Sequence, residues 1–209
     1  MNLLKNEQNL FKGVLFFMTA IFFISIVDTI CKLFTKELHA IQIVWGYFIG
    51  INLTLWVFFF LKGEKLSKLK ITDRPILQIL RPAFLVCSIS SLFIGLTYLP
   101  LAEATAIGFV APLFITILSV PILREKVGIH RWGAILVGLT GVIIIIRPGS
   151  DIFTYDALLP LGAAFGYALA GVLVKLFPKE VHTAKIQFYT QMTTLIATIF
   201  IALVTFSFS

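Results

Sequence analysis

The chain has 209 residues, of which 59% are hydrophobic and 13% are charged, and its formal net charge is +7. Soluble domains carry about 25% charged residues, so this composition excludes a water-soluble fold and favours a membrane protein. In a bilayer an excess of positive charge is first a signal of topology, and it gives no reason to expect a nucleic-acid partner.

From the N-terminus onward, seven stretches have the roughly 20 apolar residues that a helix needs to cross a bilayer. The first is too long for a signal peptide and no cleavage site follows it, so we interpret it as a retained span. No alternation of period two persists that would indicate a barrel. The sequence therefore predicts an all-α polytopic membrane protein with spans at 11–34, 41–61, 76–99, 102–123, 130–147, 156–177 and 184–206.

The polar segments between these spans differ in charge, and cytoplasmic loops of membrane proteins are the ones enriched in Lys and Arg. With the N-terminus in the cytoplasm, only Lys36 and Arg147 fall outside. We therefore predict a cytoplasmic N-terminus in a cell (inner) membrane and an external C-terminus. The cationic residues on the inner side are Lys5, Lys12, Lys62, Lys65, Lys68, Lys70, Arg74, Arg81, Arg124, Lys126, Arg131, Lys179 and Lys185.

One phrase occurs twice, as KLFTKELH at residues 32–39 and as KLFPKEVH at residues 175–182, an offset of 143 residues. It closes the first and the sixth predicted spans, so one repeat unit holds five spans and the second copy is inverted in the membrane. Inverted repeats of this kind are typical of secondary transporters. The alternative is a coincidence between two amphipathic helix exits. The repeat predicts a complete first copy at 11–149 and an incomplete second copy at 154–209, with two helices of five.

Residues 99–149 carry a group of motifs: AEATA from Ala102, a central Pro112, Glu125 in a helix exit, Arg131-Trp132 and a closing Arg147-Pro148-Gly149. These resemble the second half of an EamA repeat of the drug/metabolite transporter superfamily, and the likeness extends over residues 11–149 and 156–206. The resemblance implies ten spans and the movement of small metabolites by alternating access. Some members resemble carriers for amino acids, their derivatives or S-adenosylmethionine.

A carrier of this family needs a lipid bilayer and a small-molecule substrate, and the resemblance implies neither an enzyme nor a cofactor. Because the second copy is short, we expect a homodimer or a second polypeptide to supply the missing helices. The alternative is a truncated remnant that does not transport. A seven-helix receptor is a third hypothesis, which the charge bias and the five-span repeat disfavour. The histidines show no metal-ligand spacing, so no metal site is predicted.

Asp28 is the most informative charge, because an ionised carboxylate inside a span costs roughly 2.5–3.5 kcal/mol on insertion scales. Lys32 follows four residues later on the same helical face. The two residues either form a neutralised structural pair, or Asp28 faces a central cavity where it titrates or binds a cationic group of the substrate. The second copy has Gly171 at the equivalent position, so the acid is not part of the symmetric scaffold.

Four further residues are candidates for substrate binding, coupling or a helix break. Glu103 begins the fourth span, where it either caps the helix or takes part in coupling. Arg81, at the inner start of the third span, either snorkels or holds a substrate carboxylate. Tyr98 offers a hydrogen bond to a cavity, and Pro112 breaks the fourth span. The predicted cavity lies at the midplane between the first, third, fourth and sixth spans, and an ion gradient or exchange drives transport.

Three other patterns predict packing. Gly162, Gly166 and Ala170 follow a small-xxx-small spacing that lets helix backbones approach closely. Charges around Glu125 suggest a clasp in the turn between the fourth and fifth spans. In the last span, a polar line should avoid lipid and, with helices missing, should need a partner to cover it. That line consists of Gln187, Gln191, Thr194 and Thr198.

Overall fold

The computed structural model describes residues 2–62, 74–146, 155–177 and 183–207, and these residues form helices and no strands. Five helices within them are long and apolar enough to cross a membrane, which confirms the predicted class of an all-α polytopic membrane protein. The elements are α1 (Asn2–Phe34), α2 (Ala40–Lys62), α3 (Pro75–Tyr98), α4 (Leu101–Gly108), α5 (Ala111–Leu123), α6 (Ile129–Ile146), η2 (Tyr155–Ala157), α7 (Leu158–Val174) and α8 (Thr183–Ser207).

The five helices that meet this criterion overlap the first four predicted spans and the sixth, and the other two predicted spans coincide with α6 and α8. In apolar surroundings a helix is the form in which each segment satisfies its own backbone hydrogen bonds, so apolar runs of this length become helices. The repeat's Lys179, Glu180 and His182 lie outside the described residues, as does the closing Arg147-Pro148-Gly149.

The fourth predicted span is two helices rather than one. The chain turns at Phe109 and Val110, and α5 begins immediately afterwards with Pro112 in its first turn. Proline has no N–H to donate to the carbonyl of Gly108, and its ring is well accommodated in a first turn, so this is the place where a continuous helix is hardest to maintain. A second proline, Pro121, lies inside α5 without interrupting it.

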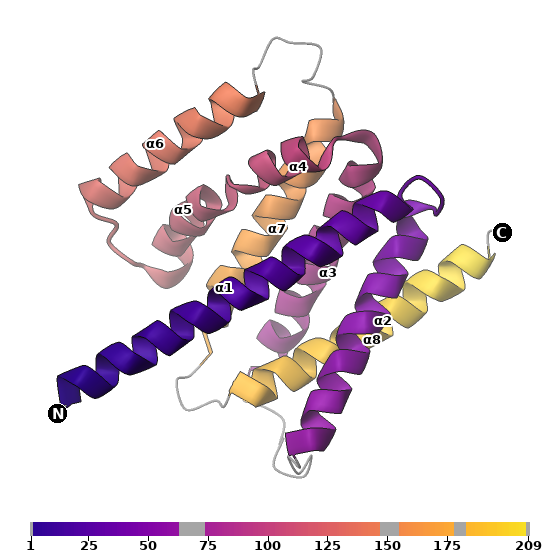
Figure 1. Ribbon diagram of the computed structural model, residues 1–209, viewed down its shortest axis with the longest axis horizontal. Helices are drawn as coiled ribbons and strands as arrows, with labels where there is room; N and C mark the ends of the chain where they lie inside the picture. The colour runs from indigo at the N-terminus through magenta and orange to yellow at the C-terminus, as the bar shows by residue number, and fades with distance from the viewer. Residues whose placement is uncertain (1, 63–73, 147–154, 178–182, 208–209) are drawn as a thin grey trace.

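α3 is the central helix of the bundle, and α7 packs against it more extensively than any other pair of elements does (Figure 1). The Ser88 hydroxyl donates to the carbonyl of Ala163 at 2.6 Å, and the Ser91 hydroxyl donates to the carbonyl of Leu159 at 2.7 Å. At Gly166 an added Cβ would lie 3.1 Å from an α3 carbonyl oxygen. The small residues of α7 therefore bring the two backbones together, as their spacing predicts.

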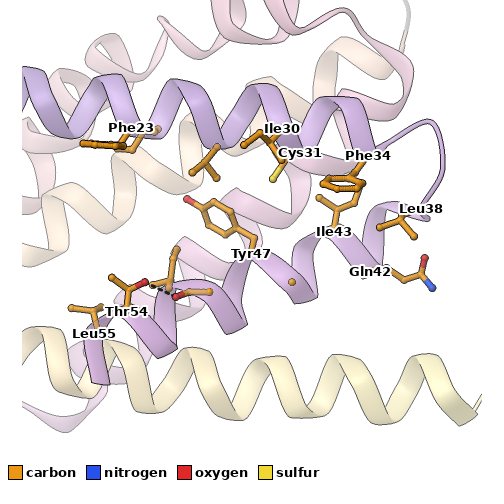
Figure 2. Close-up of a pocket in the computed structure, with 15 residues that line it drawn as sticks. Phe23, Ile30, Cys31, Phe34, Leu38, Gln42, Ile43, Tyr47, Thr54 and Leu55 are labelled. Carbon is orange, nitrogen blue, oxygen red and sulfur yellow. Dashed lines mark hydrogen bonds between the residues drawn. The ribbon is translucent and has the colours of Figure 1, made fainter. Parts of the chain in front are cut away.

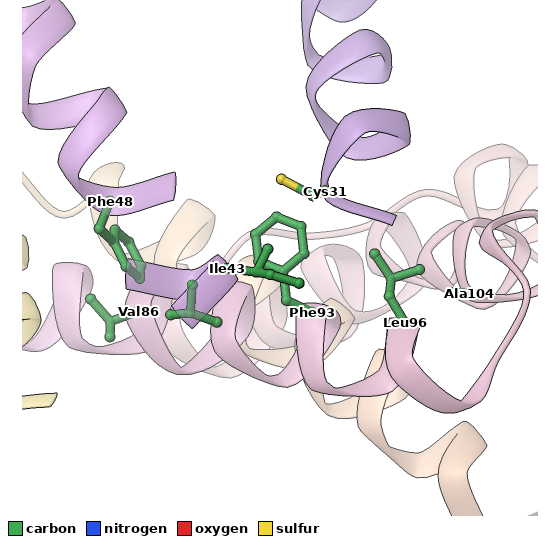
Figure 3. Packing of buried hydrophobic residues seen from close by; sticks show 8 residues of the cluster. Cys31, Ile43, Phe48, Val86, Phe93, Leu96 and Ala104 are labelled. Atoms are coloured by element: carbon green, nitrogen blue, oxygen red, sulfur yellow. The ribbon is translucent and has the colours of Figure 1, made fainter. Parts of the chain in front are cut away.

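A buried apolar cluster joins α1, α2, α3 and α4 (Figure 3). Phe93 of α3 lies at its centre, with Cys31 of α1 above it, and the Tyr47 ring packs edge-on against Phe93 at a centroid distance of 5.0 Å. A smaller cluster of Leu99, Ile107 and Ala157 links the end of α3 to the start of α7. Together these clusters hold the end of α1 and the start of α7 to α3.

The two copies of the repeated phrase begin at opposite ends of α3. The Lys32 ammonium donates to the carbonyls of Leu96 and Leu99 at the C-terminal end of α3. At the other end, Arg74 donates to the carbonyl of Leu176 at 3.0 Å, just beyond α7. α1 therefore ends where α3 ends, and α7 ends where α3 begins. An inverted repeat requires this arrangement, although the repeat itself stays a prediction.

The same contacts group the helix ends into two sets. Lys32, which the charge count leaves out because it lies near a helix end, meets the segment after α3, which the predicted topology places outside. Glu125 forms an ion pair with Lys175 at 3.4 Å, and Arg74 donates to the carbonyl of Leu176. The charge count assigns Arg74 to the inside, and the other three residues lie at helix ends on that side. The sequence suggested that Glu125 interacts with charges in its own turn, whereas its described partner, Lys175, lies just after the end of α7.

Candidate functional site

Lys32 acts as a capping group for α3. Its ammonium donates to the carbonyls of Leu96 and Leu99, the latter at 2.8 Å. The last carbonyls of a helix have no partner within the helix, and a cation is stabilised at that end by the helix dipole. The side chain is therefore committed to α3, and it does not form the pair with Asp28 that was one of the two sequence interpretations.

Asp28 is half-buried on α1, one turn before Lys32. Among the described residues its carboxylate has no ion pair and no hydrogen bond. It is close enough to Cys31 and Tyr47 to interact electrostatically with both. An unneutralised carboxylate in a span is costly, and such residues generally face a bundle interior or a water-filled cavity. The geometry therefore leaves Asp28 available to a proton or to a cationic group.

Tyr98 and Glu103 flank the place that Lys32 caps. Tyr98 is the last residue of α3, and its side chain is largely exposed. Glu103 lies in the first turn of α4 and is half-buried, and its neighbour Ala104 belongs to the same apolar cluster as Cys31. The structure thus places Lys32, Tyr98 and Glu103 at the C-terminal end of α3, with Asp28 one turn before Lys32 on α1.

Arg81 lies apart from this group. It precedes Leu96 by 15 residues on the same helix, which corresponds to about 22 Å along the axis. Its guanidinium donates to the hydroxyl of Thr190 on α8 at 2.6 Å, and that hydroxyl donates in turn to the carbonyl of Ile186. Arg81 therefore attaches α8 to α3, away from the end of α3 that Lys32 caps.

A buried polar cluster joins α2, α3 and α8 around this contact. The Asn52 amide donates to the carbonyl of Phe48 at 2.8 Å and lies 3.5 Å from the Thr194 hydroxyl. On the same helices, the Trp45 indole donates to the carbonyl of Thr198 at 3.0 Å. Three buried atoms of the cluster have no hydrogen-bond partner among the described residues: Asn52 Oδ1, Arg81 Nε and Gln191 Oε1.

This cluster corrects one sequence expectation and adds residues that sequence reasoning missed. Gln191, Thr194 and Thr198 are buried against α2 and α3, so no partner is needed to cover them, whereas the side chain of Gln187 lies outside the described set. Asn52 and Gln78 were missed although both are buried. An amide inside an apolar run was the available signal, because a polar residue in a span seldom faces lipid.

A cavity lies between α1 and α2, whereas the midplane cavity expected between the first, third, fourth and sixth spans stays a prediction. Its volume is about 750 Å³ and its lining is mainly apolar. Phe23 and Ile30 line it from α1, and the Tyr47 ring reaches from α2 into the space below α1 (Figure 2). Gly46 and Gly50 leave the α2 backbone open toward it, since an added Cβ at either would meet nothing within 4 Å.

α1 therefore has two distinct faces. Phe23, Val27, Ile30 and Phe34 line the cavity at spacings of four, three and four residues, which places them on one helical face. Ile24 and Cys31 also line the cavity, and Asp28 does not, although at 100° per residue it lies only about 40° round the helix from Ile24. On the side of α1 next to the cavity, the Lys32 ammonium reaches the carbonyls at the end of α3.

Among the described residues, no group of three or more His, Cys, Asp or Glu side chains lies close enough to hold a metal ion. Residues 11–147 match the model of the EamA-like transporter family. The chain belongs to the EamA-like transporter family. The match covers α1 through α6 and contains all the candidate residues named from the sequence, and members of this family are transporters, not enzymes.

Three relatives of this EamA-like chain are themselves named as transporters. The S-adenosylmethionine uptake transporter of Rickettsia prowazekii (strain Madrid E) is 28% identical over 91% of this chain and 64% of its own length. The riboflavin transporter of Vibrio cholerae is 46% identical over 36% of this chain and 26% of its own length. A pseudopaline exporter of Pseudomonas aeruginosa is 27% identical over 85% of this chain and 61% of its own length.

The EamA-like chain thus spans slightly less than two thirds of the length of the uptake transporters that it matches. No solved structure matches the chain. The family, the helical architecture and the named relatives identify a multi-pass membrane protein of a transporter family, and the residues around Asp28 are its candidate site.

Proposed function

We propose that this protein carries a small metabolite across the membrane by alternating access and that Asp28 binds or couples the substrate. The observation that carries the proposal is the half-buried carboxylate of Asp28, whose nearest possible counter-ion on α1, Lys32, is occupied by the carbonyls of α3. A carboxylate of this kind in a span marks a substrate or proton path more often than a structural contact.

The substrate class that fits best is a cationic amino-acid derivative of the S-adenosylmethionine type. The relative named for uptake of that compound aligns with 91% of this chain. S-adenosylmethionine carries a sulfonium and an ammonium group, either of which can pair with a carboxylate. Arg81 is assigned to holding α8, because its guanidinium already donates to the Thr190 hydroxyl.

Alternating access requires that one group of helices moves relative to another around the site. In this proposal an ion gradient or solute exchange drives the motion, and the protein lies in the inner membrane with its N-terminus in the cytoplasm. The support for that orientation is the strong excess of Lys and Arg in one set of loops. The contacts among helix ends agree with the same division into two sides.

The transporting unit contains more than the helices described here. The support is that the chain spans 64% of the length of the relatives named for S-adenosylmethionine uptake. All of the named relatives are transporters, which favours a working carrier over a remnant that does not transport.

Counterflow of labelled S-adenosylmethionine into proteoliposomes tests the proposal, with riboflavin as a second solute. Asp28→Asn should lower S-adenosylmethionine uptake at least tenfold, while thermal unfolding in detergent stays unchanged. Glu37→Gln, an exposed acid in the turn after α1, is the matched control and should transport normally. Uptake by Asp28→Asn at the level of the unchanged protein would remove the role of Asp28. Wild-type vesicles without counterflow of either solute would overturn transport by this chain alone.

A further inference from the structure

The buried polar cluster lies where α8 packs against both α2 and α3 (Figure 1). The three atoms in it that have no hydrogen-bond partner among the described residues come from three different helices. They are Oδ1 of Asn52 on α2, Nε of Arg81 on α3 and Oε1 of Gln191 on α8. Asn52 and Gln191 are each only 3% exposed. Buried polar groups in native proteins are almost always hydrogen-bonded, so these atoms together indicate a bound group.

Two contacts fix the register between α2 and α8. The Trp45 indole donates to the carbonyl of Thr198 at 3.0 Å, and the Asn52 amide lies 3.5 Å from the Thr194 hydroxyl. Residue numbers rise along α2 as they fall along α8, so the two helices are antiparallel. Gln191 precedes Thr194 by three residues and therefore lies on the same face of α8. The side chains of Asn52 and Gln191 accordingly share one interface.

Arg81 approaches the same turn of α8 from α3. Its guanidinium donates to the hydroxyl of Thr190 at 2.6 Å, whereas Asn52 approaches the hydroxyl of Thr194. These two threonines are four residues apart, about 6 Å along the helix axis, and Gln191 lies between them. The three side chains with unpartnered atoms therefore converge on a single turn of α8.

The chemistry of these atoms defines the kind of ligand. The Asn52 amide nitrogen donates to the carbonyl of Phe48 at 2.8 Å, which fixes the orientation of the amide and identifies its free atom as the oxygen. Two acceptor oxygens disfavour an anion, and the positive charge of Arg81 in the same turn disfavours a metal cation. The ligand must donate twice and accept once. Water meets this requirement, and buried waters in proteins typically make about three hydrogen bonds.

We propose that the junction of α2, α3 and α8 binds a water molecule that donates to the side-chain oxygens of Asn52 and Gln191 and accepts from Nε of Arg81. Hydrogen bonds through an ordered water are nearly as favourable in enthalpy as direct ones. The water therefore adds a link between α2 and α3 to the direct contacts that each makes with α8. The proposal concerns how the three helices are joined, and it does not depend on the solute or on transport.

NMR detects such a water as a cross-peak between the water resonance and the side-chain amide protons of Asn52. The full chain is labelled with ¹⁵N-asparagine and studied in deuterated detergent, and the Asn52 signals are assigned by their loss in Asn52→Leu. Gln191→Met replaces one acceptor of the water with a thioether of similar size. The matched control is Ser88→Ala, which removes a buried hydroxyl of α3 that bonds to the Ala163 carbonyl of α7, outside the cluster.

We expect a cross-peak from water to the Asn52 amide that weakens at least threefold in Gln191→Met and keeps its intensity in Ser88→Ala. Absence of the cross-peak in the unchanged chain would overturn the proposal, and that result needs no variant to fold. Full intensity in Gln191→Met would also contradict it, because the water is then not shared. The unfolding midpoint of Gln191→Met in detergent should be lower than that of the unchanged chain. A higher midpoint would mean that the site is dry, since removing an unsatisfied buried oxygen is stabilising.

Discussion

α1 and α7 begin the two copies of the repeat, and their surroundings differ. None of the most apolar stretch of α1 is buried, whereas half of the corresponding stretch of α7 is buried against α3 and its neighbours. The positions at which α7 has Gly166 and Ala170 are occupied by Phe23 and Val27 in α1. α1 and α7 are similarly apolar, but only α7 is closely packed. Its small residues allow the close approach of α3.

The comparison also separates what the two helices do. α7 is a packing helix, joined to α3 by serine hydroxyls that bond to its carbonyls. α1 carries the free carboxylate of Asp28 and the capping ammonium of Lys32, and its other face lines the cavity. A helix held by few contacts is the one that can move at low cost, which suits the helix that carries the candidate site.

The largest difference in stability between variants of α7 and of α1 should come from a large side chain at Gly166. An added Cβ there lies 3.1 Å from the α3 backbone, so Gly166→Leu forces α3 and α7 apart. We expect a loss of about 3 kcal/mol, at the upper end of the usual cost of overpacking. The equivalent change on α1, Phe23→Leu, should cost far less, because the side chain is exposed. Thermal unfolding in detergent measures both, and equal losses would contradict the distinction between the two helices.

A smaller difference in stability is expected between substitutions of the two lysines that begin the repeated phrase. Lys32→Met removes a cation from two α3 carbonyls in a half-buried place, and we expect a loss of about 2 kcal/mol. Lys175→Met removes an exposed ion pair with Glu125, where the loss should be below about 1 kcal/mol and should fall further at high salt. Unfolding at low and high salt tests this, and a larger loss at Lys175 would reverse the assignment.

The smallest difference in stability is expected when single hydroxyl groups are removed from α3 and from α1. Ser88→Ala removes a bond from α3 to an α7 carbonyl, and interhelical bonds in membranes contribute about 0.6 kcal/mol on average. Ser25→Ala removes a bond from α1 to a carbonyl of its own helix, so its effect on tertiary stability should be near zero. Comparing the two unfolding midpoints isolates the interhelical contribution. A larger shift from Ser25 would mean that α1 is held more tightly than its exposure implies.

Much of the candidate site was predictable from single residues. Asp28 and Arg81 stood out because charges in apolar runs are costly, and the polar line of α8 was correctly expected to avoid lipid. The partners were not predictable in the same way. Spacing offered a pair between Lys32 and Asp28 as one of two interpretations, whereas in the folded chain Lys32 donates to the carbonyls at the end of α3. The local periodicity around Lys32 gives no information about a helix end 64 residues away in the sequence.

The sequence by itself determined the class of protein, the positions of the spans and the family, because hydrophobic length and motif order are properties of the chain alone. Tertiary structure decided which helix covers which. It turned α8 toward α2 and α3, assigned Lys32 to a helix end, and left the surface between α1 and α2 open. The physical reason is that in a bilayer the apolar side chains of every span resemble one another, so close packing and buried polar contacts select the neighbours.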